Sequence, residues 1–178
     1  RLFIGIPLSE GIKHSLMKVI HFIGDDFAKV NWVKKDNLHI TLKFLGYVED
    51  NLVNTIINEL DKIKFNSFKL KLENFGVFPS YGSARVLWID IDNAINVVDL
   101  RNKVENSLKD YFNKEDKPFQ THITIGRVKF VKNKEKFVEK LKNVKVEKEE
   151  VLVNKFCLYE SILSREGPTY KFVKVFNA

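Results

Sequence analysis

The sequence predicts an α+β fold in which mainly antiparallel sheets, flanked by helices, form two lobes around a central cleft. Three observations lead to this prediction. The length of 178 residues suits one compact domain. Strand-like and helix-like segments follow one another with hairpin-like neighbours, and few strand–helix–strand units repeat as a doubly wound parallel sheet requires. A short pattern also recurs in the two halves of the chain. We therefore treat residues 1–178 as a single domain with two lobes.

The first half of the chain begins with an apolar run at residues 2–8, which is typical of a buried strand. Ser9 fits the N-cap of a helix, and Asp50 fits the N-cap of a second one. Helical spacing identifies the residues that these helices bury: Ile12, Leu16, Val19, Ile20 and Ile23 in the first, and Leu52, Val53, Ile56, Ile57, Leu60 and Ile63 in the second. The strands of this half, rich in β-branched and aromatic residues, are expected at 29–33, 38–45 and 67–78.

The second half starts after a turn at 79–83, with a strand at 85–91. A helix from about 96 to 112 follows, and its spacing turns five side chains inward: Val97, Leu100, Val104, Leu108 and Tyr111. A further short helix is expected near 133–142. The later strands of this half are predicted at 120–130, 145–153, 155–163 and 169–176.

The composition indicates a globular protein with an excess of positive charge. Hydrophobic residues make up 44% and charged residues 30%, which excludes a disordered chain. The single cysteine excludes a disulfide-stapled secreted scaffold and disfavours a cysteine-based metal site. A net charge of +7 favours anionic partners, nucleic acid first. No apolar run approaches the roughly 20 residues of a membrane span, so we expect a soluble, cytoplasmic protein with no membrane partner.

The most informative feature is a repeated tetrapeptide. Residues 39–42 read HITL and residues 122–125 read HITI, and together they hold two of the four histidines. Both lie in strand-like context, where successive side chains point to opposite faces. Each motif therefore places its histidine and threonine on one face and its aliphatic pair on the other. If the two halves are related by a pseudo-two-fold axis, the polar faces meet across the cleft.

Two imidazoles and two hydroxyls around one cleft suit phosphodiester chemistry without a metal. A neutral histidine can take a proton from the attacking group, and a protonated one can give a proton to the leaving oxygen. Both forms exist near neutral pH, because the ordinary pKa of histidine is about 6.5. The threonine hydroxyls can donate hydrogen bonds to the phosphate oxygens. We therefore predict four catalytic residues, without assigning acid and base: His39, Thr41, His122 and Thr124.

The repeat also has plainer explanations. Two strands can share a His-x-Thr sequence by chance, although a second matched copy makes that explanation much weaker. Zinc binding is disfavoured, because two histidines without a nearby cysteine or third histidine give an incomplete ligand set. No glycine-rich phosphate loop is present, which disfavours an ATP-dependent ligase. We expect neither a metal nor a cofactor.

The paired motifs resemble those of the two-histidine (2H) phosphoesterase superfamily. Within it, the chain is most similar to the bacterial and archaeal RNA 2',3'-cyclic phosphodiesterases, a LigT-like group also called 2'-5' RNA ligases. Four further stretches carry the resemblance over nearly the whole chain: RLFIGIPL, NWVKKDNLHITLKFLG, GVFPSYGSARVLWIDI and LYESILSREGPTYKFVKVF. Thr121 departs from the group, which often has proline before the second histidine; the catalytic residue types stay intact.

The resemblance implies an enzyme that opens 2',3'-cyclic phosphate ends of RNA to 2'-phosphates, and that can join RNA ends through a 2'-5' bond without ATP. It also implies that His39 donates a proton to the departing 3' oxygen and that His122 accepts one from water. The strained cyclic phosphate needs only positioning and acid–base help. RNA ends bearing this phosphate are the expected partners of a protein that we expect to be a monomer.

Two basic residues follow the motifs. Strict alternation would turn Arg127 away from His122, but Gly126 precedes it, and glycine inside a strand often marks a bulge that switches the register. Members of the family often carry arginine at this place, so we predict that Arg127 contacts the phosphate. Lys43 follows Thr41 on the same face by alternation, and we predict that it adds positive potential there, with a plain surface lysine as the alternative.

The remaining candidates have weaker support. His14 and His21 lie two helical turns apart, which is too far to chelate one metal, so we expect them on the surface. Cys157 is expected to be a small, half-buried hydrophobe. Three aromatic residues are candidates for stacking on a terminal base: Phe44, Tyr81 and Phe119.

Two rival functions stay open at this point. A non-catalytic RNA-binding module would use the basic surface alone, and its function would survive His39→Ala. A 2H enzyme for a small substrate, such as a cyclic nucleotide or an ADP-ribose cyclic phosphate, would be indifferent to the length of the RNA.

Overall fold

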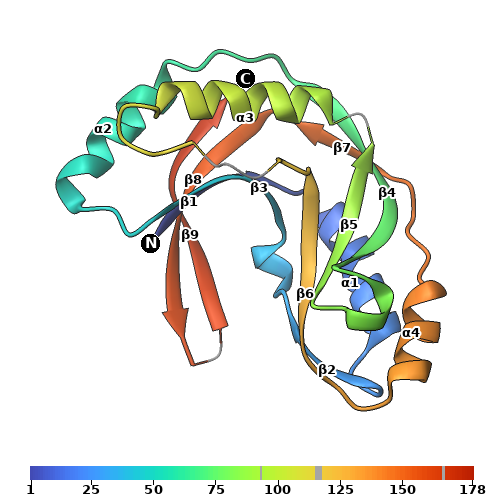
Figure 1. The fold of residues 1–178 in the computed structure, drawn as a ribbon. Coiled ribbons are helices and arrows are strands. Elements are labelled where there is room, and N and C mark those ends of the chain that lie inside the picture. Colours follow the sequence, from blue (N-terminus) through green and yellow to red (C-terminus); the bar gives the residue numbers. More distant parts are fainter. Residues whose placement is uncertain (93, 115–117, 166) are drawn as a thin grey trace.

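The computed structural model describes residues 1–92, 94–114, 118–165 and 167–178. This part of the chain folds into two antiparallel sheets with helices packed against them, which confirms the predicted α+β class (Figure 1). The first sheet has four strands, in the spatial order β3 (His39–Gly46), β1 (Leu2–Pro7), β8 (Lys155–Ser164) and β9 (Gly167–Asn177). The second has five, in the order β2 (Ala28–Trp32), β6 (His122–Val131), β5 (Val86–Asp92), β4 (Phe68–Phe78) and β7 (Glu150–Val153).

Four helices lie on the outer side of these sheets in Figure 1. Their bounds are α1 (Glu10–Ile23), α2 (Asp50–Asp61), α3 (Ile95–Ser107) and α4 (Lys134–Lys142), with short 3-10 turns at η1 (Lys35–Asn37) and η2 (Tyr81–Ser83). The side chain of Ser9 caps α1 as predicted, since it accepts a hydrogen bond from the main-chain N–H of Ile12. All five residues predicted to form the inner face of α1 are buried. None of the helices in the described ranges is long and apolar enough to span a membrane.

Both sheets combine strands from the two halves of the chain. The first sheet contains β1 and β3 together with the last two strands, β8 and β9, and the second contains β2 together with β4, β5, β6 and β7. In Figure 1 the β8–β9 hairpin lies on one side of the inner space and β6 with β2 on the other. Residues of that hairpin and of β6 line one cavity, so the inner space between the sheets is where a site can form.

Three predictions about the ends of elements are wrong. Asp50 is the first residue of α2, and Glu49 before it holds the N-cap position without a side-chain bond. Helix α3 ends early because the chain turns after Leu108, whose carbonyl oxygen accepts hydrogen bonds from the main-chain N–H groups of Tyr111 and Phe112. Tyr111 is therefore 42% exposed instead of facing inward. Strand β7 begins only at Glu150, although Val144 and Val146 in the stretch before it pack against the core.

Candidate active site

The two repeated motifs open strands β3 and β6, with a histidine as the first residue of each strand. Ile40 and Leu42 are buried, whereas His39 and Thr41 are only partly so, and the same alternation recurs in β6. The aliphatic pairs thus anchor each strand in the core, while imidazole and hydroxyl share the opposite face. The prediction from strand periodicity is confirmed for both copies.

The two motif strands belong to different sheets and are brought together. Strand β3 is an edge strand of the first sheet, β6 lies next to the edge strand β2 of the other sheet, and residues of β3 and β6 are in contact. The charge of His122 contributes to lowering the pKa of His39. The two imidazoles therefore lie within range of each other's charge.

Both rings are oriented by the same type of hydrogen bond. The Nδ1 of His39 lies 2.6 Å from the carbonyl oxygen of Asn37, and the Nδ1 of His122 lies 2.7 Å from that of Gln120. Because a carbonyl oxygen only accepts, Nδ1 carries the proton in both rings. Each Nε2 is left for chemistry, as an acceptor when its ring is neutral and as a donor when the ring is protonated.

The surroundings of His39 favour its neutral form. Aromatic rings of Phe3, Tyr170 and Tyr159 lie around it, with centroids 4.8, 5.4 and 5.9 Å away. Burial lowers the pKa of His39, the hydrogen bond to the main chain at Asn37 opposes this, and the charge of the second histidine lowers the pKa further. The Oγ1 of Thr41 lies 2.9 Å from Nε2 and donates to it when the ring is neutral.

A β-bulge follows the second motif and brings a cation to the site. The pairing of β6 with β5 skips Ile125, so that Ile125 and Gly126 are both buried and the alternation is reset. Arg127 is exposed and lines the cavity beside the motif, which confirms the bulge predicted from the glycine. A Cβ at position 126 would lie only 2.8 Å from the ring of Trp32, so the close approach of β2 requires glycine here.

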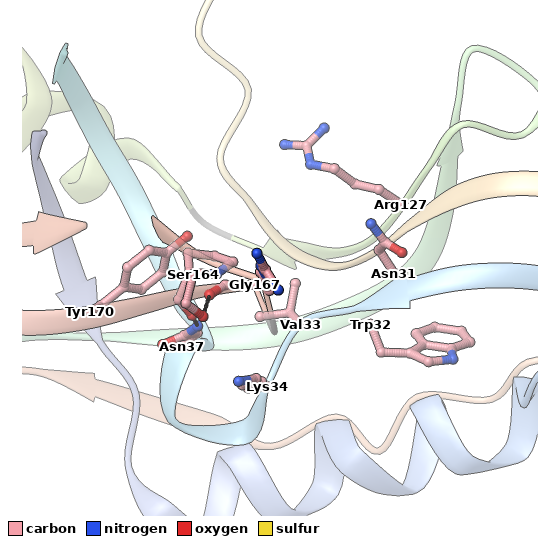
Figure 2. Close-up of a pocket in the computed structure, with 11 residues that line it drawn as sticks. Asn31, Trp32, Val33, Lys34, Asn37, Arg127, Ser164, Gly167 and Tyr170 are labelled. Atoms are coloured by element: carbon pink, nitrogen blue, oxygen red, sulfur yellow. Dashed lines mark hydrogen bonds between the residues drawn. The ribbon is translucent and has the colours of Figure 1, made fainter. Parts of the chain in front are cut away.

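Tyr170, whose ring packs against His39, lines two cavities, although none of the four motif residues is itself among the lining residues of either. The smaller, of about 240 Å³, is lined by Phe3 and Phe44 among others. The larger, of about 560 Å³, has polar and basic walls that come from both sheets (Figure 2). Its lining includes Asn31, Lys34, Arg127, Arg165 and Tyr170.

A family model described as "LigT like Phosphoesterase" matches this chain twice, at residues 6–88 and 89–170. The chain belongs to the LigT-like phosphoesterase family. Each of the two matches contains one His-x-Thr motif, as a duplicated fold requires.

Relatives of this LigT-like phosphoesterase are similar over almost their whole length. Proteins of Methanocaldococcus jannaschii and Archaeoglobus fulgidus are each 35% identical over 177 residues, covering 98% of both chains in the first case and 99% in the second. Both are named RNA 2',3'-cyclic phosphodiesterase, as is a Thermotoga maritima protein that is 33% identical over 174 residues.

Solved structures share the fold. A Thermus thermophilus protein superposes with a TM-score of 0.85 at 24% identity, covering 99% of this chain and 97% of that one. Escherichia coli LigT in complex with 3'-AMP gives a TM-score of 0.80 at 23% identity, with the same coverage. At these identities the likeness establishes the architecture of the LigT-like phosphoesterase and nothing finer.

The prediction for Lys43 is wrong. A bulge in β3 skips Leu42, and it turns the next side chain into the core instead of onto the motif face. Lys43 is 2% exposed, and its Nζ lies 2.8 Å from Glu105 of α3 and 3.1 Å from the carbonyl oxygen of Asn113. Its charge is therefore paired inside the protein, and the residue that the bulge leaves on the surface is Phe44, which is 63% exposed.

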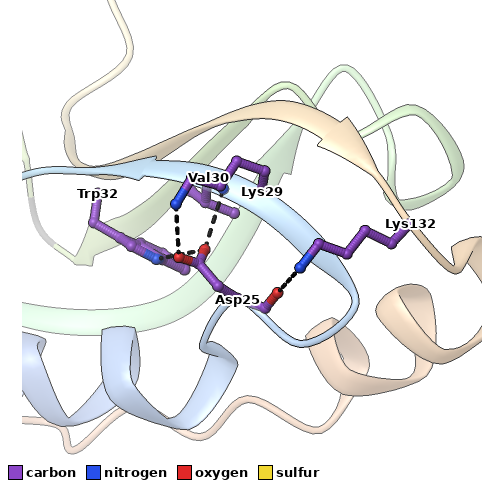
Figure 3. Close-up of polar contacts among 5 residues, drawn as sticks. All are labelled: Asp25, Lys29, Val30, Trp32 and Lys132. Carbon is purple, nitrogen blue, oxygen red and sulfur yellow. Dashed lines mark hydrogen bonds and ion pairs between the residues drawn. The ribbon is translucent and has the colours of Figure 1, made fainter.

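A cluster of hydrogen bonds around Asp25, which sequence reasoning missed, supports the Arg127 bulge (Figure 3). The Oδ1 atom of Asp25 accepts a hydrogen bond from Nε1 of Trp32 at 3.2 Å, which fixes the indole against Gly126. Asp25 receives three more hydrogen bonds, two at its carboxylate and one at its carbonyl, from Val30 N, Lys29 Nζ and Lys132 Nζ. This cluster joins the loop before β2 to the end of β6.

Sequence reasoning also missed two residues that position His39. Asn37 orients the ring through its carbonyl, and its side-chain Nδ2 donates to the carbonyl of Pro168 at 2.7 Å, which fastens η1 to the β8–β9 hairpin. Gly5 lies under the ring, where a Cβ would meet the carbonyl oxygen of Ile40 at 2.9 Å. A glycine inside the opening apolar run was a readable signal of such a close approach.

The structure also places the aromatic, histidine and cysteine candidates. Of the three aromatic candidates, Phe44 lines the smaller cavity, whereas Tyr81 packs on the core and Phe119 lies against the guanidinium of Arg101, 4.6 Å from ring centroid to Cζ. His14 and His21 are exposed as expected, whereas Cys157, expected to be half-buried, is fully buried, which raises the pKa of its thiol to about 11. Among the residues that the structure describes, no three His, Cys, Asp or Glu side chains gather as a metal-ligand set.

Proposed function

We propose that this LigT-like phosphoesterase hydrolyses terminal 2',3'-cyclic phosphates of RNA to 2'-phosphomonoesters by metal-independent two-histidine catalysis. One observation carries the proposal: two imidazoles in one site are each held through Nδ1 by a main-chain carbonyl, which leaves both Nε2 atoms for proton transfer. The names of the 35% identical relatives support the same reaction and the same class of substrate.

The reaction needs one proton acceptor and one proton donor on opposite sides of the phosphorus. Water attacks the phosphorus opposite O3', and Nε2 of neutral His122 accepts a proton from it. As the P–O3' bond breaks, protonated His39 donates its Nε2 proton to O3'. The P–O2' bond stays intact, so the product carries a 2'-phosphate and a free 3'-hydroxyl. Exchange with solvent returns both rings to their starting forms.

Three side chains are proposed to stabilise the charge that builds up on the phosphate oxygens. The hydroxyls of Thr41 and Thr124 donate hydrogen bonds to the non-bridging oxygens, and the guanidinium of Arg127 adds positive charge beside them. Protonation of His39 also frees Thr41 for this task, because a protonated Nε2 no longer accepts the hydroxyl hydrogen.

The assignment of donor and acceptor rests on the substrate's own charge. The pKa of His39 is lowered in the free protein, so this donor must gain its proton when the anionic phosphate enters the site and raises that pKa again. The reverse assignment, with His39 as acceptor, is the alternative that its neutral form favours. A bell-shaped pH profile does not separate the two, since they differ only in which ring holds one proton.

A change of leaving group does separate them. A thiolate departs without protonation, so a substrate with sulfur in place of O3' makes the proton donor dispensable. His39→Ala should lose at least about 10²-fold in kcat on the ordinary cyclic phosphate and recover most of it on the 3'-thio analogue. His122→Ala should stay impaired on both substrates. The opposite pattern would reverse the roles.

The same variants and a chelator test the mechanism as a whole. We expect turnover to persist in EDTA, and Thr41→Val and Thr124→Val to lose less than either histidine variant. Loss of activity on chelation, or normal turnover by a variant without either histidine, would contradict the mechanism. Absence of turnover of any cyclic phosphate, with RNA binding that survives His39→Ala, would instead indicate a non-catalytic RNA-binding module.

The site also allows ATP-independent joining of RNA ends. The 5'-hydroxyl of a second RNA takes the place of water, loses its proton to the same acceptor and forms a 2'-5' bond as P–O3' breaks. We place these reactions in a monomer in the cytoplasm, and light scattering checks the monomer. Equal turnover of mononucleotide and oligonucleotide cyclic phosphates would instead indicate a small-molecule substrate.

A further inference from the structure

The larger cavity holds more positive charge than the proposed reaction uses. Lys34, Arg127 and Arg165 line it, and only Arg127 is assigned to the cyclic phosphate. The side chains of Lys34 and Arg165 are exposed and have no hydrogen bond or ion pair within the described part of the chain. The neighbouring Lys35, in contrast, is paired with Glu10 at 3.0 Å. None of the described residues that line this cavity is acidic.

These two cations come from two walls of the cavity that a hydrogen bond joins beside His39. Lys34 precedes η1, and Arg165 lies in the turn between β8 and β9. The bond from Asn37 to the carbonyl of Pro168 joins the two walls, and the carbonyl of the same Asn37 holds His39. Figure 2 shows Asn37 and Tyr170 on one side of this space and Arg127 on the other. The unpaired cations therefore keep a defined place relative to the histidines.

We propose that Lys34 and Arg165 bind a second phosphate, the one attached to the 5' oxygen of the nucleoside that carries the cyclic phosphate. The inference rests on the proposed function. In an RNA end these two anions are separated by one ribose, so a site that takes the first at Arg127 needs further cations one sugar away. The volume of about 560 Å³ falls in the range of roughly 300–1,000 Å³ found for ligand sites.

The chemistry of the two side chains fits this phosphate. Arginine offers a planar fork of donors to phosphate oxygens, and lysine supplies a mobile point charge from the other wall. A phosphate at this position belongs to every RNA chain longer than one nucleotide, and also to small nucleotides that carry a 5'-phosphate. The site would thus distinguish an RNA end from a bare cyclic nucleoside phosphate.

Three substrates separate these sources: adenosine 2',3'-cyclic phosphate, its 5'-phosphorylated form, and the dinucleotide ApA with a 2',3'-cyclic phosphate end. We expect the 5'-phosphorylated form and the dinucleotide to exceed the bare nucleotide in kcat/KM by about tenfold, as a charge-assisted contact gives. A gain confined to the 5'-phosphorylated mononucleotide would point to a small nucleotide as the substrate. No gain for either would overturn the proposal.

A matched pair of double variants tests the residues. K34Q/R165Q should bring the preference for a 5'-phosphate close to one. K109Q/K142Q removes the same charge from exposed lysines outside the cavity and should keep the preference. If the preference survives K34Q/R165Q, or falls equally in both variants, Lys34 and Arg165 do not form this site.

A binding measurement keeps this test separate from the proposed function. The affinity for a single-stranded oligonucleotide with a 3'-terminal phosphate is followed by fluorescence anisotropy over a range of salt. Loss of one phosphate contact should reduce the slope of log K against log salt by about 0.7 in K34Q/R165Q, and not in the control. A slope change without turnover of any cyclic phosphate would refute the proposed function alone. Turnover with neither a preference nor a slope change would refute the second phosphate site alone.

Discussion

Gly5 offers the most direct test of how the fold positions His39. An alanine Cβ at this position would lie 2.9 Å from the carbonyl oxygen of Ile40 and 3.1 Å from Cδ2 of His39. Carbon–oxygen contacts between adjacent strands ordinarily lie at about 3.3–3.6 Å. Gly5→Ala must therefore open the β1–β3 contact by at least about 0.4 Å, and His39 moves with its strand.

The displacement sets the size of the expected effect. A misplacement of about 1 Å costs about 10²-fold in rate, so a shift of about 0.4 Å should lower kcat/KM about sixfold if the logarithm of the loss scales with distance. Overpacking should also lower the free energy of unfolding by about 1–3 kcal/mol. Activity and stability thus fall together, but for separable reasons.

The assay is hydrolysis of adenosine 2',3'-cyclic phosphate, followed by chromatography at a temperature where melting curves show every variant folded. Gly11→Ala is the matched control, because a Cβ there meets nothing within 4 Å on the exposed side of α1. It should keep wild-type kcat/KM and gain up to about 1 kcal/mol in stability from helix propensity. A folded Gly5→Ala variant with wild-type kcat/KM would show that this contact does not position the His39 ring for the proposed reaction.

Three further predictions follow from burial. Lys43→Met should lower the free energy of unfolding in urea by about 3 kcal/mol, because Glu105 loses a buried partner. The folded variant should keep its turnover. A loss of activity at unchanged stability would indicate that Lys43 does act in the site. Thr121→Val should raise the free energy of unfolding by about 1 kcal/mol, since the buried Oγ1 has no hydrogen-bond partner in the described structure, and a lower melting temperature would contradict this. The pKa of His39 is lower in the folded than in the unfolded chain, so its contribution to stability is present above about pH 6.5 and is lost as the pH falls toward the folded value. His39→Gln should flatten that acid-side decline in unfolding experiments, and an unchanged decline would refute the origin assigned to it.

The sequence sufficed wherever a local period determines which way a side chain points. The inner face of α1 and the two faces of each motif follow from the helical and strand repeats, and the structure places them as expected. Arg127 was also predictable, because Gly126 marks the bulge that resets the alternation. These are properties of single segments, which need no knowledge of what packs against them.

Contacts between distant segments were beyond such reasoning. The hydrogen bond from Asn37 to Pro168 joins residues far apart in the chain, and the exchange of strands between the two sheets decides that they meet. The cluster of hydrogen bonds around Asp25 likewise depends on β2 lying beside β6. No periodicity in one strand encodes its partner, so these residues are recognised only once the sheet order is known.

Lys43 shows how a duplicated motif can mislead. Both motif strands have a bulge at the same place, but glycine marks it only in β6, where position 126 corresponds to Lys43 of β3. A lysine looks like a surface residue, and the buried carboxylate of Glu105 that holds it comes from α3. The residue after each bulge returns to the motif face, and there the copies differ again, with Arg127 in one and Phe44 in the other. The repeat thus supplies the symmetric pair of histidines, while the residues outside it give the site a cationic side and an aromatic side.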